Sequence, residues 1–172
     1  MKNTLKFLSL GLTLCLFICT SCVSDNSDEG TISPVDDANV MRASIGSFTF
    51  ESDDVNTGSS LSGASGAQTL RLSAGDGSRI ITLEIIGYVG EGTYDVSTTV
   101  PERRVVASYA ASNGSTNINE WPVWNAPFEN STNGQVVINS ASDTSVSGSF
   151  NFVGKNGDET LSISNGSFTI ML

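Results

Sequence analysis

Apolar and polar residues alternate in short runs over most of the chain, and the runs are separated by Gly, Asn, Asp and Ser. Such alternation is typical of β-strands that bury one face, and the separating residues are typical of tight turns. The pattern is clearest in residues 145–152, where every even position is apolar or Gly and every odd position is polar. No stretch keeps apolar residues at helical spacing over three turns, so the pattern predicts an all-β domain.

The strongest local prediction is a hairpin. Residues 70–73 and 81–85 alternate on either side of the turn at 75–78, which has the sequence Gly-Asp-Gly-Ser. Further strands are expected at residues 93–97, 105–110 and 135–140, which brings the total to about eight or nine. Short connections favour an antiparallel meander that forms a sandwich or a lipocalin-like barrel, and the pattern does not decide between the two.

At two points along the chain the apolar residues change from odd-numbered to even-numbered positions, which predicts irregularities within strands. One switch lies at Gly46-Ser47, inside a strand expected over residues 41–52, and predicts a β-bulge. The other lies at Asn165-Gly166, inside residues 161–172, and predicts a bulge or a tight turn. The Gly-rich residues 58–66 show no such pattern and are expected to form a flexible loop.

Residues 1–21 have the features of a secretory leader. Lys2 and Lys6 supply a basic start, and a mostly apolar run follows over residues 7–18. This run is shorter than the roughly 20 residues that a membrane-spanning helix needs. The sequence therefore predicts a signal peptide, then a flexible acidic tether over residues 22–40 and a single domain over residues 41–172.

Cys22 directly follows the leader, and this arrangement resembles the processing site of a bacterial lipoprotein. The resemblance implies cleavage before Cys22 and attachment of fatty acyl chains such as palmitate to it. Cys19 stands where the common motif has Leu, as in the looser sites of Bacteroidetes. An ordinary leader that is cleaved near Ser21 and receives no lipid is the alternative.

The residues after Cys22 bear on location. Val23 is not the Asp that marks inner-membrane retention in many Gram-negative bacteria. The acidic cluster Asp25, Asp28 and Glu29 resembles the export signal of Bacteroidetes surface lipoproteins. We therefore expect a lipid-anchored protein of the outer membrane, displayed at the cell surface.

Composition excludes several kinds of chemistry. The chain has 18 acidic and 8 basic residues, so it lacks the electrostatic footprint of a nucleic-acid-binding protein. It has no His, and its Cys residues are Cys15, Cys19 and Cys22. The folded part therefore has neither Cys–His nor Ser–His–Asp catalysis available. No cofactor and no metal are expected, and the membrane is the expected partner, through lipid on Cys22.

Both tryptophans lie in one aromatic, Pro-containing stretch, residues 121–128. Exposed aromatic side chains can stack on sugar rings or apolar ligands, so Trp121, Trp124 and Phe128 are candidate contacts for a glycan or a small apolar ligand. The alternative is that the two indoles close one end of the fold, with their N–H groups bonded to the backbone.

We expect a binding or structural domain and not an enzyme. The alternative is a carboxylate-dependent glycan hydrolase, which needs two carboxylates about 5–10 Å apart across a cleft. No pair in the sequence stands in a recognisable motif for this reaction. The carboxylates considered are Glu51, Asp53, Asp54, Glu84, Glu120 and Glu129.

The order of features from residue 48 to the C-terminus resembles a Bacteroidetes lipoprotein family of unknown function, the DUF6252 family. The leader and Cys22 contribute to the resemblance, together with the segments 70–74, 81–85, 90–94, 107–109, 146–152 and 164–168. The resemblance implies an all-β fold and a place in the cell envelope. It implies no catalytic or binding residue.

Overall fold

The computed structural model describes residues 39–172, which fold into antiparallel β-strands. The predicted signal peptide, Cys22 and most of the predicted tether lie outside the described residues. Within residues 39–172, no helix is long and apolar enough to cross a membrane. The strands are β1 (Val40–Ile45), β2 (Phe48–Glu51), β3 (Gly58–Ser62), β4 (Gln68–Gly75), β5 (Arg79–Tyr88), β6 (Gly92–Ser97), β7 (Arg104–Ala111), β8 (Val123–Ala126), β9 (Thr132–Ala141), β10 (Ser145–Asn156) and β11 (Glu159–Met171).

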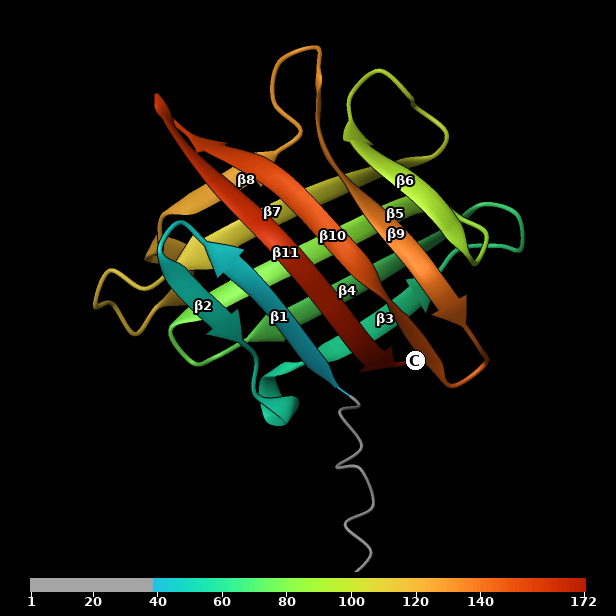
Figure 1. The fold of residues 1–172 in the computed structure, drawn as a ribbon, viewed down its shortest axis with the longest axis horizontal. Coiled ribbons are helices and arrows are strands. Elements are labelled where there is room, and N and C mark those ends of the chain that lie inside the picture. Colours follow the sequence, from blue (N-terminus) through green and yellow to red (C-terminus); the bar gives the residue numbers. More distant parts are fainter. Residues whose placement is uncertain (1–38) are drawn as a thin grey trace, which may run out of the picture. The chain divides into compact units, whose positions relative to one another are not determined.

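All eleven strands belong to one sheet that curls over on itself as a half-barrel. The main path runs β2-β1-β11-β10-β8-β7-β5-β4-β3, and β9 pairs with both β10 and β6. The long strand β10 joins the two halves, because its first part pairs with β9 whereas Lys155, near its end, pairs with Asn125 of β8. Figure 1 shows the result as two crossing layers, with β1, β2, β6, β9, β10 and β11 in front of β3, β4, β5, β7 and β8.

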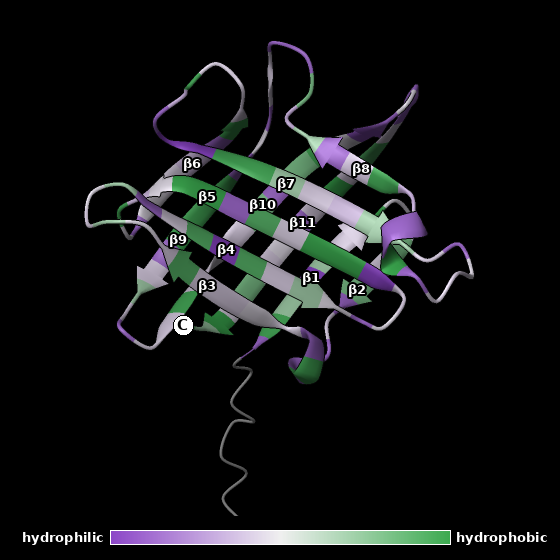
Figure 2. Ribbon diagram, turned by 180° about the vertical axis from the view of Figure 1, so that it is seen from behind, coloured by the Kyte–Doolittle hydropathy of each residue, from purple (hydrophilic) through white to green (hydrophobic). Residues whose placement is uncertain are grey.

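The core lies between these two layers. Most strands contribute every second residue to it, as in β5, where Ile81, Leu83 and Ile85 are fully buried and their neighbours are partly exposed. Figure 2 shows the outside of β3, β4, β5 and β7, where hydrophobic and hydrophilic residues alternate along β4 and β5. Period-two burial is what a sheet with one solvent-facing side requires.

Several predictions from the pattern are confirmed. The fold is all-β and antiparallel, and β4 and β5 form the predicted hairpin with Leu72 opposite Leu83. The turn between them is stabilised by Asp76, whose Oδ1 accepts hydrogen bonds from the backbone N–H groups of Ser78 (2.9 Å) and Arg79 (2.7 Å). The irregularity predicted in β11 is also present: the register against β10 shifts there, and Asn165 has φ +49°.

The prediction for Gly46-Ser47 is wrong. The chain reverses there instead of bulging, and Ile45 lies opposite Phe48 across a two-residue hairpin that joins β1 to β2. Gly46 has φ +57°, a left-handed conformation that Gly adopts without steric penalty. A hairpin of this length and a bulge both change the parity of apolar positions, so the switch alone does not distinguish them.

Two short strands were not expected. β3 lies within the Gly-rich residues 58–66, which were predicted to be a flexible loop, and β8 lies within the aromatic stretch. With β2 separated from β1 as well, the sheet has eleven strands rather than eight or nine.

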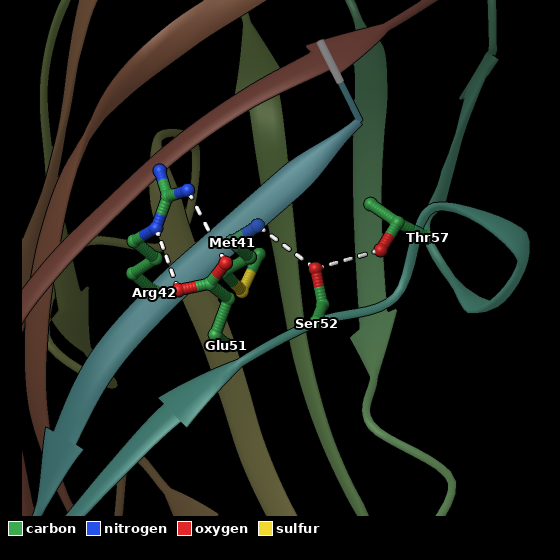
Figure 3. Close-up of polar contacts among 5 residues, drawn as sticks. All are labelled: Met41, Arg42, Glu51, Ser52 and Thr57. Carbon is green, nitrogen blue, oxygen red and sulfur yellow. Dashed lines mark hydrogen bonds and ion pairs between the residues drawn. The ribbon is translucent and has the colours of Figure 1, made fainter. Parts of the chain in front are cut away.

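Ser52 fixes the chain where it leaves β2. Its hydroxyl oxygen accepts a hydrogen bond from the backbone N–H of Met41 (2.9 Å), and it is also hydrogen-bonded to Thr57 Oγ1 (2.8 Å) (Figure 3). Beside it, Arg42 of β1 forms an ion pair with Glu51 of β2 at 3.0 Å. Ser52 itself is buried, and these bonds hold the 3₁₀ turn Asp54–Asn56 against the sheet.

A Ser52→Ala variant should lose about 2 kcal/mol of unfolding free energy, because the buried N–H of Met41 would be left without its acceptor. Urea unfolding followed by circular dichroism measures the loss. Ser149→Ala is the matched control, since the Ser149 side chain lies on the outside of β10 and makes no hydrogen bond to residues 39–172. Equal stability of the two variants would contradict this role of Ser52.

Candidate functional site

Two adjoining cavities form a trough beside β3, β4 and β5. Asn56 and Ser73 line both cavities, so the two lie side by side. The first is a shallow, open depression of about 390 Å³, lined by Val55, Asn56, Thr57, Gly58, Ser59, Ser60, Arg71 and Ser73. The second encloses about 280 Å³ and is lined by Asn56, Ser73, Gly75, Gly77, Ile80, Ile118 and Trp121. We call these residues together the trough.

The 3₁₀ turn Asp54–Asn56 supplies one wall of the trough. Ser52 holds this turn through its hydrogen bond with Thr57. Thr57 Oγ1 is also hydrogen-bonded to the carbonyl oxygen of Asp53 (2.7 Å). The backbone N–H of Asp53 donates to the carbonyl of Gly75 at 2.8 Å, which ties the turn to the end of β4. Asn56 thereby lines both cavities, and its Nδ2 donates to Asp53 Oδ2 at 3.5 Å.

The loop after β7 supplies the opposite wall and carries Trp121. The indole Nε1–H of Trp121 donates to the carbonyl of Ser115 at 2.8 Å, which fixes the ring. Glu120 braces the same loop, because its carboxylate accepts hydrogen bonds from Ser115 Oγ (2.7 Å) and Asn117 Nδ2 (3.1 Å). The loop is attached to the β4–β5 turn by a bond from the Ser112 N–H to the Ser78 carbonyl at 2.8 Å. Trp121 is only partly buried.

Trp124 lies in a different cavity, at one end of the space between the layers. This end groove encloses about 310 Å³ and is lined by Ile45, Gly46, Ser47, Phe48, Tyr109, Ala111, Trp124, Glu159 and Leu161. The rings of Trp124 and Tyr109 are 5.6 Å apart and tilted by 38°, and Phe48 is 60% exposed. Burial raises the pKa of Tyr109 above 10.0, although the nearby Arg79 acts in the opposite direction.

The indole N–H of Trp124 is buried and has no hydrogen-bond partner within residues 39–172. The expectation that both indoles would bond to the backbone therefore holds for Trp121 and not for Trp124. Neither indole ring is fully buried, so part of each ring is accessible at the surface.

Phe128 lies apart from the trough and from the end groove. Its ring faces Lys155, whose Nζ is 5.5 Å from the ring centroid. Lys155 Nζ also bonds to Glu129 Oε1 at 2.9 Å, and this bond raises the pKa of Lys155 above its ordinary value. The structure thus separates the three candidate aromatic residues into three places, and their role as ligand contacts stays a prediction.

The carboxylates considered for hydrolysis are also dispersed. Glu51 pairs with Arg42, Glu129 pairs with Lys155, and Glu120 bonds within its own loop. Glu84 lies on the outside of β5, opposite Arg71 in the ladder. In residues 39–172, no three Asp or Glu side chains come together as a metal-binding group.

Two residues of the trough, Arg71 and Ser73, were not singled out from the sequence as site residues. Arg71 and Ser73 occupy polar positions of an alternating strand, where an outward-facing residue is expected whatever it does. Their grouping with Asn56 arises from the 3₁₀ turn, for which the alternation gives no signal.

Residues 64–171 match the family model DUF6252, described as a domain of unknown function. No curated protein matches the chain, and no solved structure does. The matched segment spans β4 to β11 and covers more than half of the chain. The chain therefore belongs to the DUF6252 family of domains of unknown function.

Proposed function

We propose that this chain is a lipid-anchored, non-enzymatic domain of the bacterial cell envelope that binds a glycan in the trough. One observation above all supports the proposal: the partly exposed indole of Trp121 lies with Ile80 and Ile118 in a cavity that adjoins a second cavity lined mainly by hydroxyl groups. A sugar ring has an apolar C–H face and a rim of hydroxyl groups. Stacking on the indole and hydrogen bonds to Asn56 and Ser73 match these two features.

The proposed location follows from Cys22 and the acidic residues after it. An acidic chain has no basic patch to hold it on an anionic membrane surface, so the attachment must come from lipid. One acyl chain gives only marginal binding, whereas two or three on the same cysteine hold firmly. Display on the outer surface, as in Bacteroidetes lipoproteins, would expose the trough to glycans outside the cell.

A Trp121→Ala variant should bind its glycan about fivefold more weakly, which corresponds to a stacking contribution of about 1 kcal/mol. The glycan is first found by applying the full chain, purified in detergent from the expressing cells, to a glycan array. Calorimetric titration then gives the Kd of each variant. A folded protein that binds no glycan on the array would contradict the proposal and favour a structural role.

Two further variants locate the site. Phe128→Ala removes an aromatic ring that is close to Trp121 in sequence but lies outside the trough, and it should leave the Kd unchanged. Trp124→Phe leaves Trp121 as the sole tryptophan, so a change in its fluorescence on glycan binding reports the trough directly. A loss with Phe128→Ala equal to that with Trp121→Ala would place binding on the Phe128 loop instead.

A further inference from the structure

The trough has two chemically different ends. Trp121 and Ile80 form an apolar end beside the β4–β5 turn, and Arg71 lies at the other end. Arg71 precedes Gly75 by four residues along β4. At about 3.3 Å per residue, the two ends are roughly 13 Å apart. A single sugar ring is too short to reach both ends, whereas a chain of linked sugars can.

Arg71 is the one charged residue among those lining the trough, all of which lie in the described part of the chain. It is exposed, and within residues 39–172 it forms neither an ion pair nor a side-chain hydrogen bond. Three other cations form ion pairs: Arg42 with Glu51, Arg79 with Asp76, and Lys155 with Glu129. In a chain with 18 acidic residues, a cavity with an available guanidinium and no carboxylate in its lining is suited to an anion.

Glu84 is the nearest opposing charge by register. It lies directly opposite Arg71 in the β4–β5 ladder and on the same face of the sheet, although the two side chains form no ion pair. Residues so placed have Cβ atoms about 5 Å apart, so Glu84 weakens the attraction of Arg71 for an anion. Removal of this charge should therefore strengthen the binding of an anionic ligand.

We propose that the ligand of the trough is an acidic glycan of at least two linked sugars. One sugar ring stacks on Trp121, and a carboxylate or sulfate group on another sugar binds Arg71. The planar guanidinium can give two parallel hydrogen bonds to either anion, which a neutral side chain cannot do. This inference rests on the proposed glycan-binding function and adds the charge and the minimum length of the ligand.

The test uses the full chain in detergent and a glycan array that holds uronate-containing and sulfated oligosaccharides beside neutral forms of the same sugars. Binding should be confined to the acidic member of each bound pair, and the array shows which acid is preferred. Arg71→Gln should weaken this binding about threefold to fivefold, as expected for an exposed charged contact. Glu84→Gln should strengthen it about twofold. Arg104→Gln is the matched control, because it removes an equal charge from β7 outside the trough.

The outcomes separate this inference from the function on which it rests. Suppose that neutral glycans bind, that Trp121→Ala weakens their binding and that Arg71→Gln does not. This result would overturn the inference and leave the proposed function intact. Equal losses with Arg71→Gln and Arg104→Gln would show a general charge effect and would also overturn it. A folded protein that binds no glycan would overturn both. Circular dichroism of each variant confirms that it is folded.

Discussion

A Cys22→Ser variant should be released from the membrane and recovered almost entirely in the soluble fraction. Each acyl CH₂ group in the bilayer contributes about 0.8 kcal/mol, so loss of two or three chains removes essentially all membrane affinity. Serine keeps the size of the side chain and lacks the thiol that accepts the lipid. Metabolic labelling with an alkyne-bearing palmitate, followed by membrane fractionation, measures both attachment and release.

Cys19→Ser is the matched control for this experiment. It makes the same chemical change three residues earlier, within the predicted leader, and should leave labelling and membrane association unchanged. Persistent labelling of Cys22→Ser would show that lipid is attached elsewhere. An unlabelled Cys22→Ser protein that keeps its full length and stays on the membrane would instead indicate an uncleaved leader, and gel mobility distinguishes the two results.

A Gly148→Ala variant should lose about 3 kcal/mol of unfolding free energy, because overpacking of a filled core commonly costs about 1–3 kcal/mol. Gly148 is buried in the middle of β10, opposite Phe168 of β11 and Ile138 of β9. A methyl group there would overlap the carbonyl oxygen of Val137 and lie 2.8 Å from Cζ of Phe168. The strands on both sides are hydrogen-bonded to β10, so neither can move away freely.

Gly58→Ala provides the comparison for this substitution. Gly58 also lies in a strand, but an added methyl group there would meet no atom within 4 Å. The unfolding free energy of the Gly58→Ala variant should differ from that of the unaltered chain by less than about 0.5 kcal/mol. Urea titrations of both variants against the unaltered chain measure the difference. Equal stabilities would mean that β9, β10 and β11 can separate far enough to admit a side chain.

The strands that the sequence predicted are those with several large apolar residues on one face. β5 and β10 each bury a full row, and their alternation is strong enough to be read without a structure. β3 has the sequence Gly-Ser-Ser-Leu-Ser, in which Leu61 is the single large apolar residue and is 45% exposed. β3 is a strand because it is hydrogen-bonded to β4, and the pattern of apolar and polar residues within β3 does not indicate this pairing.

The candidate site was predictable in its residue types but not in its arrangement. Trp121 and Trp124 are close in sequence, and both line cavities, yet these cavities are different. Their spacing contained a usable signal, because residues three apart in extended chain point to opposite sides. The trough itself depends on the 3₁₀ turn Asp54–Asn56, which Ser52 holds through hydrogen bonds with Met41 and Thr57 that alternation along the chain does not reveal.

The two ends of the folded part meet. The backbone N–H of Met171 donates to Asn39 Oδ1 at 2.9 Å, and the carbonyl of Met171 accepts from Ser59 Oγ at 2.6 Å. An epitope tag or reporter fused after Leu172 would therefore emerge beside Asn39 and close to β3 and the trough. Labels intended to leave ligand binding undisturbed belong in a turn away from these ends, such as the one at Gly157 between β10 and β11, where added bulk meets open space.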